Sequence, residues 1–141
     1  MVKGGARRKA RRGALELLFE AHARQVDPEA LLAERLESPV DESPVRPYAQ
    51  EIVRGVAARQ DRIDELLATY STGWTLDRMP KVDRELLRIG AWETLYNPAV
   101  PASVAIDEAV ALAVELSTDS SPSFVNGLLG RIASLAPNLA D

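Results

Sequence analysis

Apolar side chains recur every three or four residues through most of this 141-residue chain, and few segments alternate with a period of two. The first spacing places side chains on one face of an α-helix, whereas strict alternation is typical of a half-buried strand. The clearest example is the segment 82–96, where Val82, Leu86 and Ile89 fall on one helical face. A chain of this length suits one compact core, because two domains would each have too little surface to bury. The pattern therefore predicts an all-α fold in a single domain over residues 1–141.

Prolines and capping residues divide this helical pattern into separate elements. Proline follows Asp27 and Ser121, and a short polar side chain before proline is typical of a helix start, because its oxygen accepts a hydrogen bond from a free backbone N–H. Gly4 and Gly5 predict a flexible hinge before the first helix, and Pro137 is expected to end the last one. The expected helices cover residues 6–24, a stretch from residue 28, and residues 47–58, 61–70, 82–96, 104–116 and 124–135.

One dipeptide, Asn126-Gly127, contradicts this helical pattern. Placed between two apolar pairs, it is a strong signal for a β-hairpin. Two strands of two or three residues, with no third strand to join, would not be stable in water. We therefore expect the helix to continue and Gly127 to be a position of close packing, at a cost of about 1 kcal/mol relative to alanine.

Charge is divided sharply along the chain. Residues 1–12, the basic arm, carry six cations and no acid, whereas the remaining 129 residues hold 11 basic and 21 acidic side chains and a net charge of −10. On a helix, Arg7 and Arg11 lie one turn apart, as do Arg8 and Arg12, with Lys9 beside them. Arginine favours bidentate phosphate contacts and stacks on bases. The arm therefore predicts polyanion binding, and its mutual repulsion predicts that it frays until counter-charge arrives.

Two other interpretations of the basic arm remain open. A solvated helix end without a partner has the same composition, and an arginine-rich, acid-poor start is also typical of a mitochondrial targeting peptide. However, the arm runs without a break into the first expected core helix, which a removable peptide should not do.

The residues needed for most catalytic and metal chemistry are missing from the sequence. The chain has no cysteine and a single histidine, His22, which is expected at the edge of the core. No zinc-protease, phosphate-loop or dinucleotide-binding motif occurs, and the adjacent acids Asp107 and Glu108 diverge by about 100° on a helix. The apolar runs are short and broken by charge. We therefore predict a cytoplasmic protein that is not an enzyme and needs no cofactor or metal.

Two aromatic residues, Tyr70 and Phe124, are expected at helix edges beside polar loops. There a ring can stack on an unpaired base, although both residues would also suit the core. For Phe19 and Trp92 we favour core or partner contact. No helix-turn-helix spacing is evident, so single-stranded RNA suits this chain better than duplex DNA.

Three stretches in series resemble the NusB family of transcription antitermination factors. They are ARRKARRGALELLF at 6–19, WTLDR at 74–78 with VDRELLRIGAWE at 82–93, and VPASVAIDEAV at 100–110 with FVNGLL at 124–129. The resemblance implies about seven helices in two small packed bundles. It also implies binding to the boxA element of ribosomal RNA leader transcripts together with NusE, a small-subunit ribosomal protein. With other Nus factors, such a protein would help the RNA polymerase elongation complex to read through terminators.

The resemblance also assigns residues by position. It implies RNA contacts at Arg7, Arg8, Lys9, Arg11, Tyr70, Ser120 and Phe124. It implies a NusE-facing surface around Phe19 and Asp83, with Arg84 and Arg88 nearby. The chain departs from the family at Asp119-Ser120, where an acidic pair is common, and at Ser123, where a basic or polar residue is common. Loss of the acid would strengthen phosphate binding, whereas loss of the base would weaken it.

Two functions follow from these features. The first is RNA binding through the basic arm, and the second is a protein-interaction module whose acidic body recruits a basic partner, with the arm idle. A homodimer through Phe19 and the helix 82–92 is a further alternative for the free protein.

Overall fold

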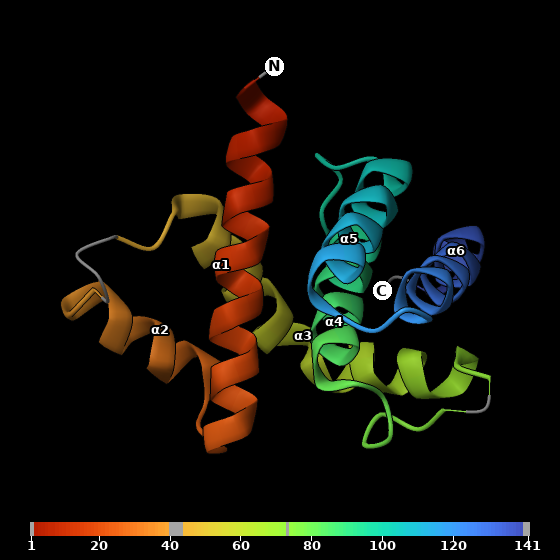
Figure 1. Cartoon of the computed structure of the whole chain (residues 1–141), viewed down its shortest axis with the longest axis horizontal. Coiled ribbons are helices and arrows are strands. Elements are labelled where there is room, and N and C mark those ends of the chain that lie inside the picture. Colours follow the sequence, from red (N-terminus) through yellow and green to blue (C-terminus); the bar gives the residue numbers. More distant parts are fainter. Residues whose placement is uncertain (1, 40–43, 73, 140–141) are drawn as a thin grey trace. The chain divides into compact units, whose positions relative to one another are not determined.

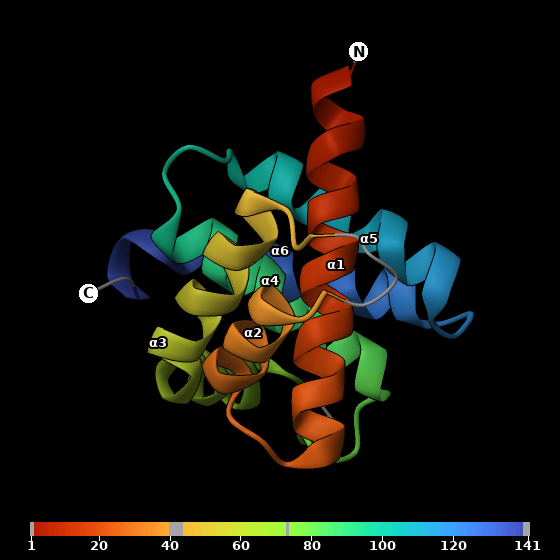
Figure 2. The same ribbon diagram turned by 90° about the vertical axis from the view of Figure 1, so that its left-hand side faces the viewer.

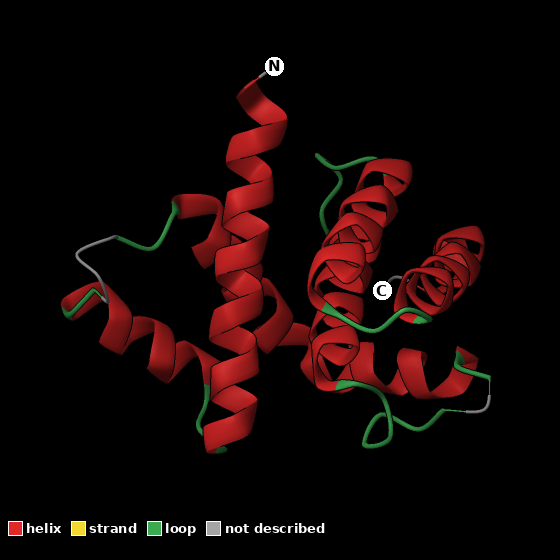
Figure 3. Cartoon of the chain, in the orientation of Figure 1, coloured by secondary structure: helices red, strands yellow, loops and turns green. Residues whose placement is uncertain are grey.

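A computed structural model describes residues 2–39, 44–72 and 74–139, and its regular structure within those ranges is entirely helical (Figures 1 and 3). This confirms the all-α prediction. The helices are α1 (Val2–Arg24), α2 (Pro28–Glu37), α3 (Pro47–Tyr70), α4 (Lys81–Tyr96), α5 (Ala102–Leu116) and α6 (Ser121–Leu139).

There are six helices in the described ranges instead of about seven, because two expected helices merge into α3. The backbone of Arg59 has non-helical angles, φ −121° and ψ 16°, so α3 kinks where a break was expected. The chain divides at this kink into two compact units, Met1–Ala58 and Arg59–Asp141. Two small bundles are what the family resemblance implies.

The first unit contains α1, α2 and the N-terminal half of α3. In Figure 2, α2 turns back from the C-terminal end of α1 and packs against it. Asp27 caps α2 as expected, since its Oδ2 accepts a hydrogen bond from the backbone N–H of Ala30 at 3.1 Å, and Pro28 follows at the first helical position. The buried core of this unit includes Leu15, Leu18, Leu31, Leu32, Ile52, Val53 and Val56.

Glu20 links α1 to α2 and should make this unit sensitive to acid. Its Oε2 accepts hydrogen bonds from Arg35 at 2.7 Å and Arg24 at 2.9 Å, and these bonds lower the pKa of Glu20 below its ordinary value of 4.5. A carboxyl with a depressed folded pKa stabilises the protein above its unfolded pKa, and this stability is lost as the pH falls through the folded pKa. Glu20→Gln should therefore lower the thermal midpoint slightly at neutral pH, and this difference should shrink as the pH falls through the folded pKa of Glu20. A difference of equal size at neutral pH and at the most acidic pH where the chain stays folded would contradict this.

The second unit contains α4, α5 and α6, which pack against one another, and the C-terminal half of α3. Helix α6 packs tightly against α4 at Gly90, where a Cβ would lie 2.5 Å from Cδ1 of Leu129. The prediction of close packing at Gly127 was wrong, because a Cβ there would meet nothing within 4 Å. The helix through Asn126-Gly127 is confirmed, since α6 runs across it without a turn.

Four further local predictions were wrong. Helix α1 begins at Val2, so the Gly4-Gly5 hinge and the frayed arm are both replaced by helix, because extending an existing helix costs far less than starting one. Helix α6 continues through Pro137 to Leu139, whose carbonyl accepts a hydrogen bond from Arg62 Nη2 at 3.2 Å. His22 is exposed in the last turn of α1, where a basic side chain complements the helix dipole.

Candidate functional site

Where the structure describes the side chains of the basic arm, from residue 5 onward, three of its cations are exposed on the first turns of α1. Arg7, Arg8 and Lys9 are all exposed. Arg7 lies over the ring of Tyr48, with its Cζ 4.0 Å from the ring centroid, and Arg11 Cζ lies 5.7 Å from the same centroid. Cation–π contacts of this kind attract a guanidinium to the ring face and restrict its position. Tyr48 therefore holds Arg7 in place, which helps to offset the repulsion expected along the arm.

Arg11 differs from its neighbours, because only 3% of it is exposed. A phosphate on the surface therefore meets Arg7, Arg8 and Lys9 first. The RNA contact that the sequence predicts for Arg11 stays a prediction, and the structure gives this residue an interior position in the arm.

A hollow without acidic residues lies between the arm and the start of α3. Its volume is about 170 Å³. The lining consists of Ala6, Arg7, Ala10, Arg46, Pro47 and Tyr48. Arg46 is exposed and adds a further cation beside the arm. A larger hollow of about 380 Å³ in the same unit is lined by both signs of charge, including Glu16, Glu20 and Arg35, so it suits a polyanion less well.

A second acid-free hollow, the aromatic hollow, lies in the second unit and brings Tyr70 and Phe124 together. Its volume is about 270 Å³. The lining consists of Tyr70, Ser71, Thr72, Ser123, Phe124, Gly127, Leu128 and Arg131. Trp74, 43% exposed, extends this aromatic surface, since its ring centroid lies 5.8 Å from that of Phe124. The arrangement offers ring faces, hydroxyl groups and one guanidinium, which is the chemistry that single-stranded nucleic acids meet on proteins.

Asp83 fixes the turn that leads into α6. Only 1% of it is exposed, and its carboxylate accepts hydrogen bonds from Ser117 Oγ at 2.6 Å and Ser121 Oγ at 2.8 Å. Ser120 lies exposed within this turn, and Phe124 follows one helical turn after it. Asp83 thus positions the segment that carries two of the predicted RNA contacts.

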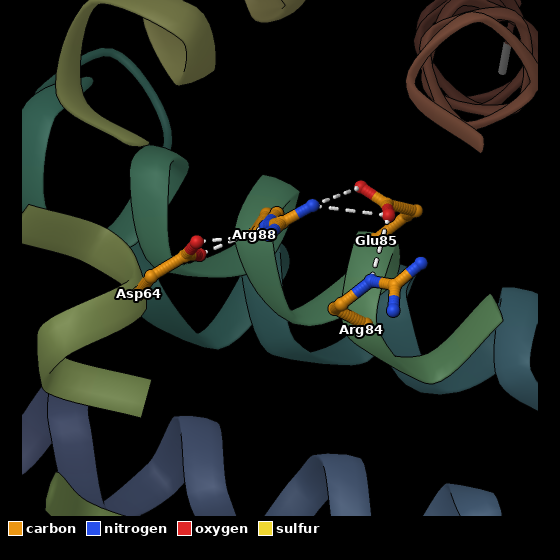
Figure 4. Close-up of polar contacts among 4 residues, drawn as sticks. All are labelled: Asp64, Arg84, Glu85 and Arg88. Atoms are coloured by element: carbon orange, nitrogen blue, oxygen red, sulfur yellow. Dashed lines mark hydrogen bonds and ion pairs between the residues drawn. The ribbon is translucent and has the colours of Figure 1, made fainter. Parts of the chain in front are cut away.

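Arg84 and Arg88 belong to a buried ion network in the second unit (Figure 4). Arg88 donates to both oxygens of Asp64 at 2.8 Å and to both oxygens of Glu85 at 3.1 Å, and Arg84 Nε donates to Glu85 at 3.0 Å. Burial favours the neutral form of Arg88, but the hydrogen bonds and charges of the two carboxylates outweigh it, so the pKa of Arg88 is raised. The guanidinium therefore stays charged inside the unit.

The predicted partner-binding residues therefore fall into two groups. Phe19 is 37% exposed on α1, an unusual position for a phenylalanine in a helical bundle. Asp83, Arg84 and Arg88 are buried and bonded within the second unit. Their predicted roles in partner binding stay predictions. The structure shows Asp83 and Arg88 bonded to residues outside α4, and Arg84 bonded to Glu85 within α4.

Several residues at the two acid-free hollows were not singled out from the sequence. Arg131 lines the aromatic hollow because it follows Phe124 by seven residues, which places both on one face of α6. That spacing was available in the sequence. Tyr48 and Arg46 reach the arm only through the packing of α3 against α1, which no local pattern reveals.

Within the described residues, no group of three or more acidic or histidine side chains is placed to hold a metal ion. None of the helices there is both long and apolar enough to cross a membrane.

Comparison with known proteins finds matches over nearly the whole chain. The NusB family model matches residues 8–134. The transcription antitermination protein NusB of Beutenbergia cavernae is 61% identical over 144 residues, which cover 96% of this chain and 94% of that protein. The structure of T. maritima NusB is similar with a TM-score of 0.78 and 36% identity, covering 91% of this chain and 90% of that one. A chain from a crystal structure of the antitermination factors NusB and NusE in complex with dsRNA has the same fold, with a TM-score of 0.78, 24% identity and 95% and 98% coverage.

Proposed function

Because this chain belongs to the NusB family, whose model covers residues 8–134, we propose that it binds boxA in ribosomal RNA leader transcripts together with NusE. In this role it promotes read-through by the RNA polymerase elongation complex, with the other Nus factors, in the cytoplasm. The family consists of transcription antitermination factors and not of enzymes, which confirms the expectation drawn from the missing motifs.

The observation that carries the RNA-binding proposal is the separation of charge on the chain. Three exposed cations and Arg46 gather at one end of the first unit without an acid in the hollow beside them, although residues 13–141 carry a net charge of −10. Phosphate contacts supply most of the sequence-independent affinity for nucleic acids. The aromatic hollow supports an unpaired strand over a duplex, because bases must leave a helical stack before a ring can stack on them.

NusE is the proposed protein partner, and Phe19 the proposed anchor for it. A solved NusB relative forms a complex with NusE and double-stranded RNA, and we extend the partnership to this chain. The acidic body supports the extension, since ribosomal proteins are basic and opposite charge speeds encounter. Asp83 and Arg88 contribute by holding the helices that shape the surface, and Arg84 contributes through its bond to Glu85 of the same network.

Replacing Phe19 with alanine should weaken NusE binding by roughly 10- to 30-fold, since aromatic side chains at interface centres are common hot spots worth about 2 kcal/mol. The measurement is isothermal titration calorimetry with purified NusE. Leu36→Ala, which removes another exposed apolar side chain of the same unit, is the matched control and should bind like the wild type. Equal losses in both variants would contradict an anchor at Phe19.

The proposed function is tested by titrating the chain with a boxA RNA oligonucleotide and a scrambled RNA, with and without NusE, at several salt concentrations. We expect boxA binding that exceeds scrambled binding and tightens when NusE is present. Binding to RNA only in the presence of NusE would mean that the arm alone is insufficient. Binding of NusE without any binding of RNA in either arm would favour the alternative, an interaction module that recruits a basic partner. Equal affinity for both RNAs in every arm would overturn boxA recognition.

A further inference from the structure

We propose that the start of α3 forms a second side of the RNA-binding surface, where Arg46 binds one phosphate directly and Tyr48 positions Arg7 for another. The inference rests on the proposed function, because it adds residues of a second helix to the RNA contacts of the basic arm. Neither Arg46 nor Tyr48 is among the residues that the family resemblance assigns.

Arg46 lies between two exposed cations of α1. The N-terminal end of α3 runs beside α1 (Figures 1 and 2). Among the described residues, Arg46 is the one shared by the linings of the hollow of about 170 Å³, which includes Arg7, and of the hollow of about 380 Å³, which includes Lys9. Arg7 and Lys9 diverge by about 200° around the helix axis. Arg8 therefore lies between them on one side of α1, and Arg46 lies between them on the side of α3.

The guanidinium of Arg46 is available to a phosphate. It is exposed, and no ion pair joins it to another residue in the described part of the chain. By contrast, Arg35 in the larger hollow is bonded to Glu20 at 2.7 Å, so these two charges offset each other. Glu16, the other acid in that lining, lies two helical turns beyond Lys9 on α1, which leaves the end of the hollow near Lys9 and Arg46 positive. An arginine with free donors can bind one phosphate in a bidentate manner.

Tyr48 places the guanidinium of Arg7 on the side of α1 that faces α3. The Cζ atom of Arg7 lies 4.0 Å from the ring centroid, and the ring itself is half-buried. A cation–π contact of this kind restricts the side chain before RNA arrives, so less rotational freedom is lost when Arg7 meets a phosphate. Arg46 and Arg7 border the same acid-free hollow, so a strand that follows the α3 side of α1 meets both guanidinium groups.

The first test titrates the full chain with boxA RNA and with scrambled RNA at several salt concentrations, with and without NusE. Arg46→Gln should lower the slope of log affinity against log salt by about 0.7 for both RNAs, because a phosphate contact does not depend on base sequence. If the variant and the wild type bind equally at about 1 M salt, binding by the variant is roughly eightfold weaker at about 50 mM. Arg46→Lys keeps the charge and should therefore keep the wild-type slope.

Arg54→Gln is the matched control for Arg46→Gln. It removes an exposed cation from α3, about two helical turns after Arg46, and Arg54 lines neither of the two hollows beside α1. Its slope should equal that of the wild type. Arg46 is exposed and precedes the first residue of α3, so the thermal midpoint of Arg46→Gln should match that of the wild type, which separates a lost contact from a folding defect.

The second test is a double-mutant cycle on Tyr48 and Arg7. Tyr48→Leu should weaken RNA binding by about two- to fivefold, since it removes the ring that positions Arg7. It should have no further effect in a chain that already carries Arg7→Ala, because no guanidinium is then left to position. Tyr48→Phe keeps the ring face and should bind within about twofold of the wild type. An equal loss with and without Arg7 would remove Tyr48 from the site.

The outcomes separate this inference from the proposed function. A wild-type slope in Arg46→Gln, or an equal decrease of the slope in Arg54→Gln, would overturn the phosphate contact at Arg46, while a preference of the wild type for boxA would leave the proposed function standing. If the wild type binds boxA and scrambled RNA equally, boxA recognition fails. A smaller slope in Arg46→Gln but not in Arg54→Gln would still support the contact in that case, because it is measured on both RNAs.

Discussion

Replacing Arg7 and Arg8 with alanine should weaken binding of a boxA RNA oligonucleotide by roughly 60-fold at about 50 mM salt. Each phosphate neutralised by a protein cation releases condensed counterions, so log affinity falls with log salt by about 0.7 per contact on a single strand. Losing two contacts lowers the steepness of this dependence by about 1.4. If the two proteins bind equally at about 1 M salt, where counterion release no longer favours binding, their affinities differ by roughly 60-fold at about 50 mM. Arg7 and Arg8 are suited to this test because both side chains are exposed.

The same salt titration measures how many residues of the arm contact phosphate groups. Replacing Arg7, Arg8, Lys9 and Arg11 together should reduce the slope by about 2, because only the first three are exposed. A reduction near 3 would show that Arg11 leaves its buried position to reach the RNA.

The matched control for the arm is Arg24→Ala with Arg54→Ala. It makes the same charge change at two exposed arginines of the same unit, and neither of them lines the hollow beside the arm. Its slope should equal that of the wild type. A wild-type slope of log affinity against log salt in the Arg7 and Arg8 variant would exclude the arm from RNA binding. An equal decrease of that slope in both double variants would exclude it too.

Replacing Arg88 with methionine should destabilise the chain by about 3–5 kcal/mol, because it removes the shared partner of a fully buried carboxylate, Glu85, and a partly buried one, Asp64. Glu85 is fully buried and would keep only Arg84, while Asp64 would lose both of its 2.8 Å hydrogen bonds to Arg88. For a chain of this length the loss corresponds to a fall of roughly 10–15 °C in the thermal midpoint. Differential scanning calorimetry measures it directly.

Two variants sharpen this second test. Arg88→Lys keeps the charge but not the planar guanidinium that bonds two carboxylates. Its thermal midpoint should therefore lie between those of Arg88→Met and the wild type. Glu65→Ala breaks an exposed ion pair, Arg62–Glu65, and should cost no more than about 1 kcal/mol. Equal stability of Arg88→Met and the wild type would show that the network contributes nothing to the fold.

The fold was largely predictable because its signals are local. Asp27 before Pro28 predicted the start of α2, and the helical spacing of Val82, Leu86 and Ile89 predicted α4. The errors concern places where packing outweighs local preference. Gly127 was expected in a tight contact, but that contact is made by Gly90, since only the meeting of α4 with α6 decides which glycine faces a neighbour.

The candidate site was predictable only in part. Charge counting located the arm, and the family resemblance named Tyr70 and Phe124, which the structure brings to one hollow. Neither of these revealed that Arg11 is buried while Arg7, Arg8 and Lys9 are exposed, or that Asp83 and Arg88 are interior. Burial depends on which elements cover a residue, and those elements are distant in sequence.

The sequence alone determined the helical character of this protein, the uneven distribution of its charge and its family. Periodicity, charge and motif order depend only on which residues follow one another along the chain. Only the folded chain decided that Tyr48 supports Arg7, that Tyr70 and Phe124 border one hollow, and that Arg88 joins α3 to α4. Such contacts form when segments separated by tens of residues pack side by side. Which residues become neighbours there depends on dense packing and on the energetic cost of unpaired buried polar groups.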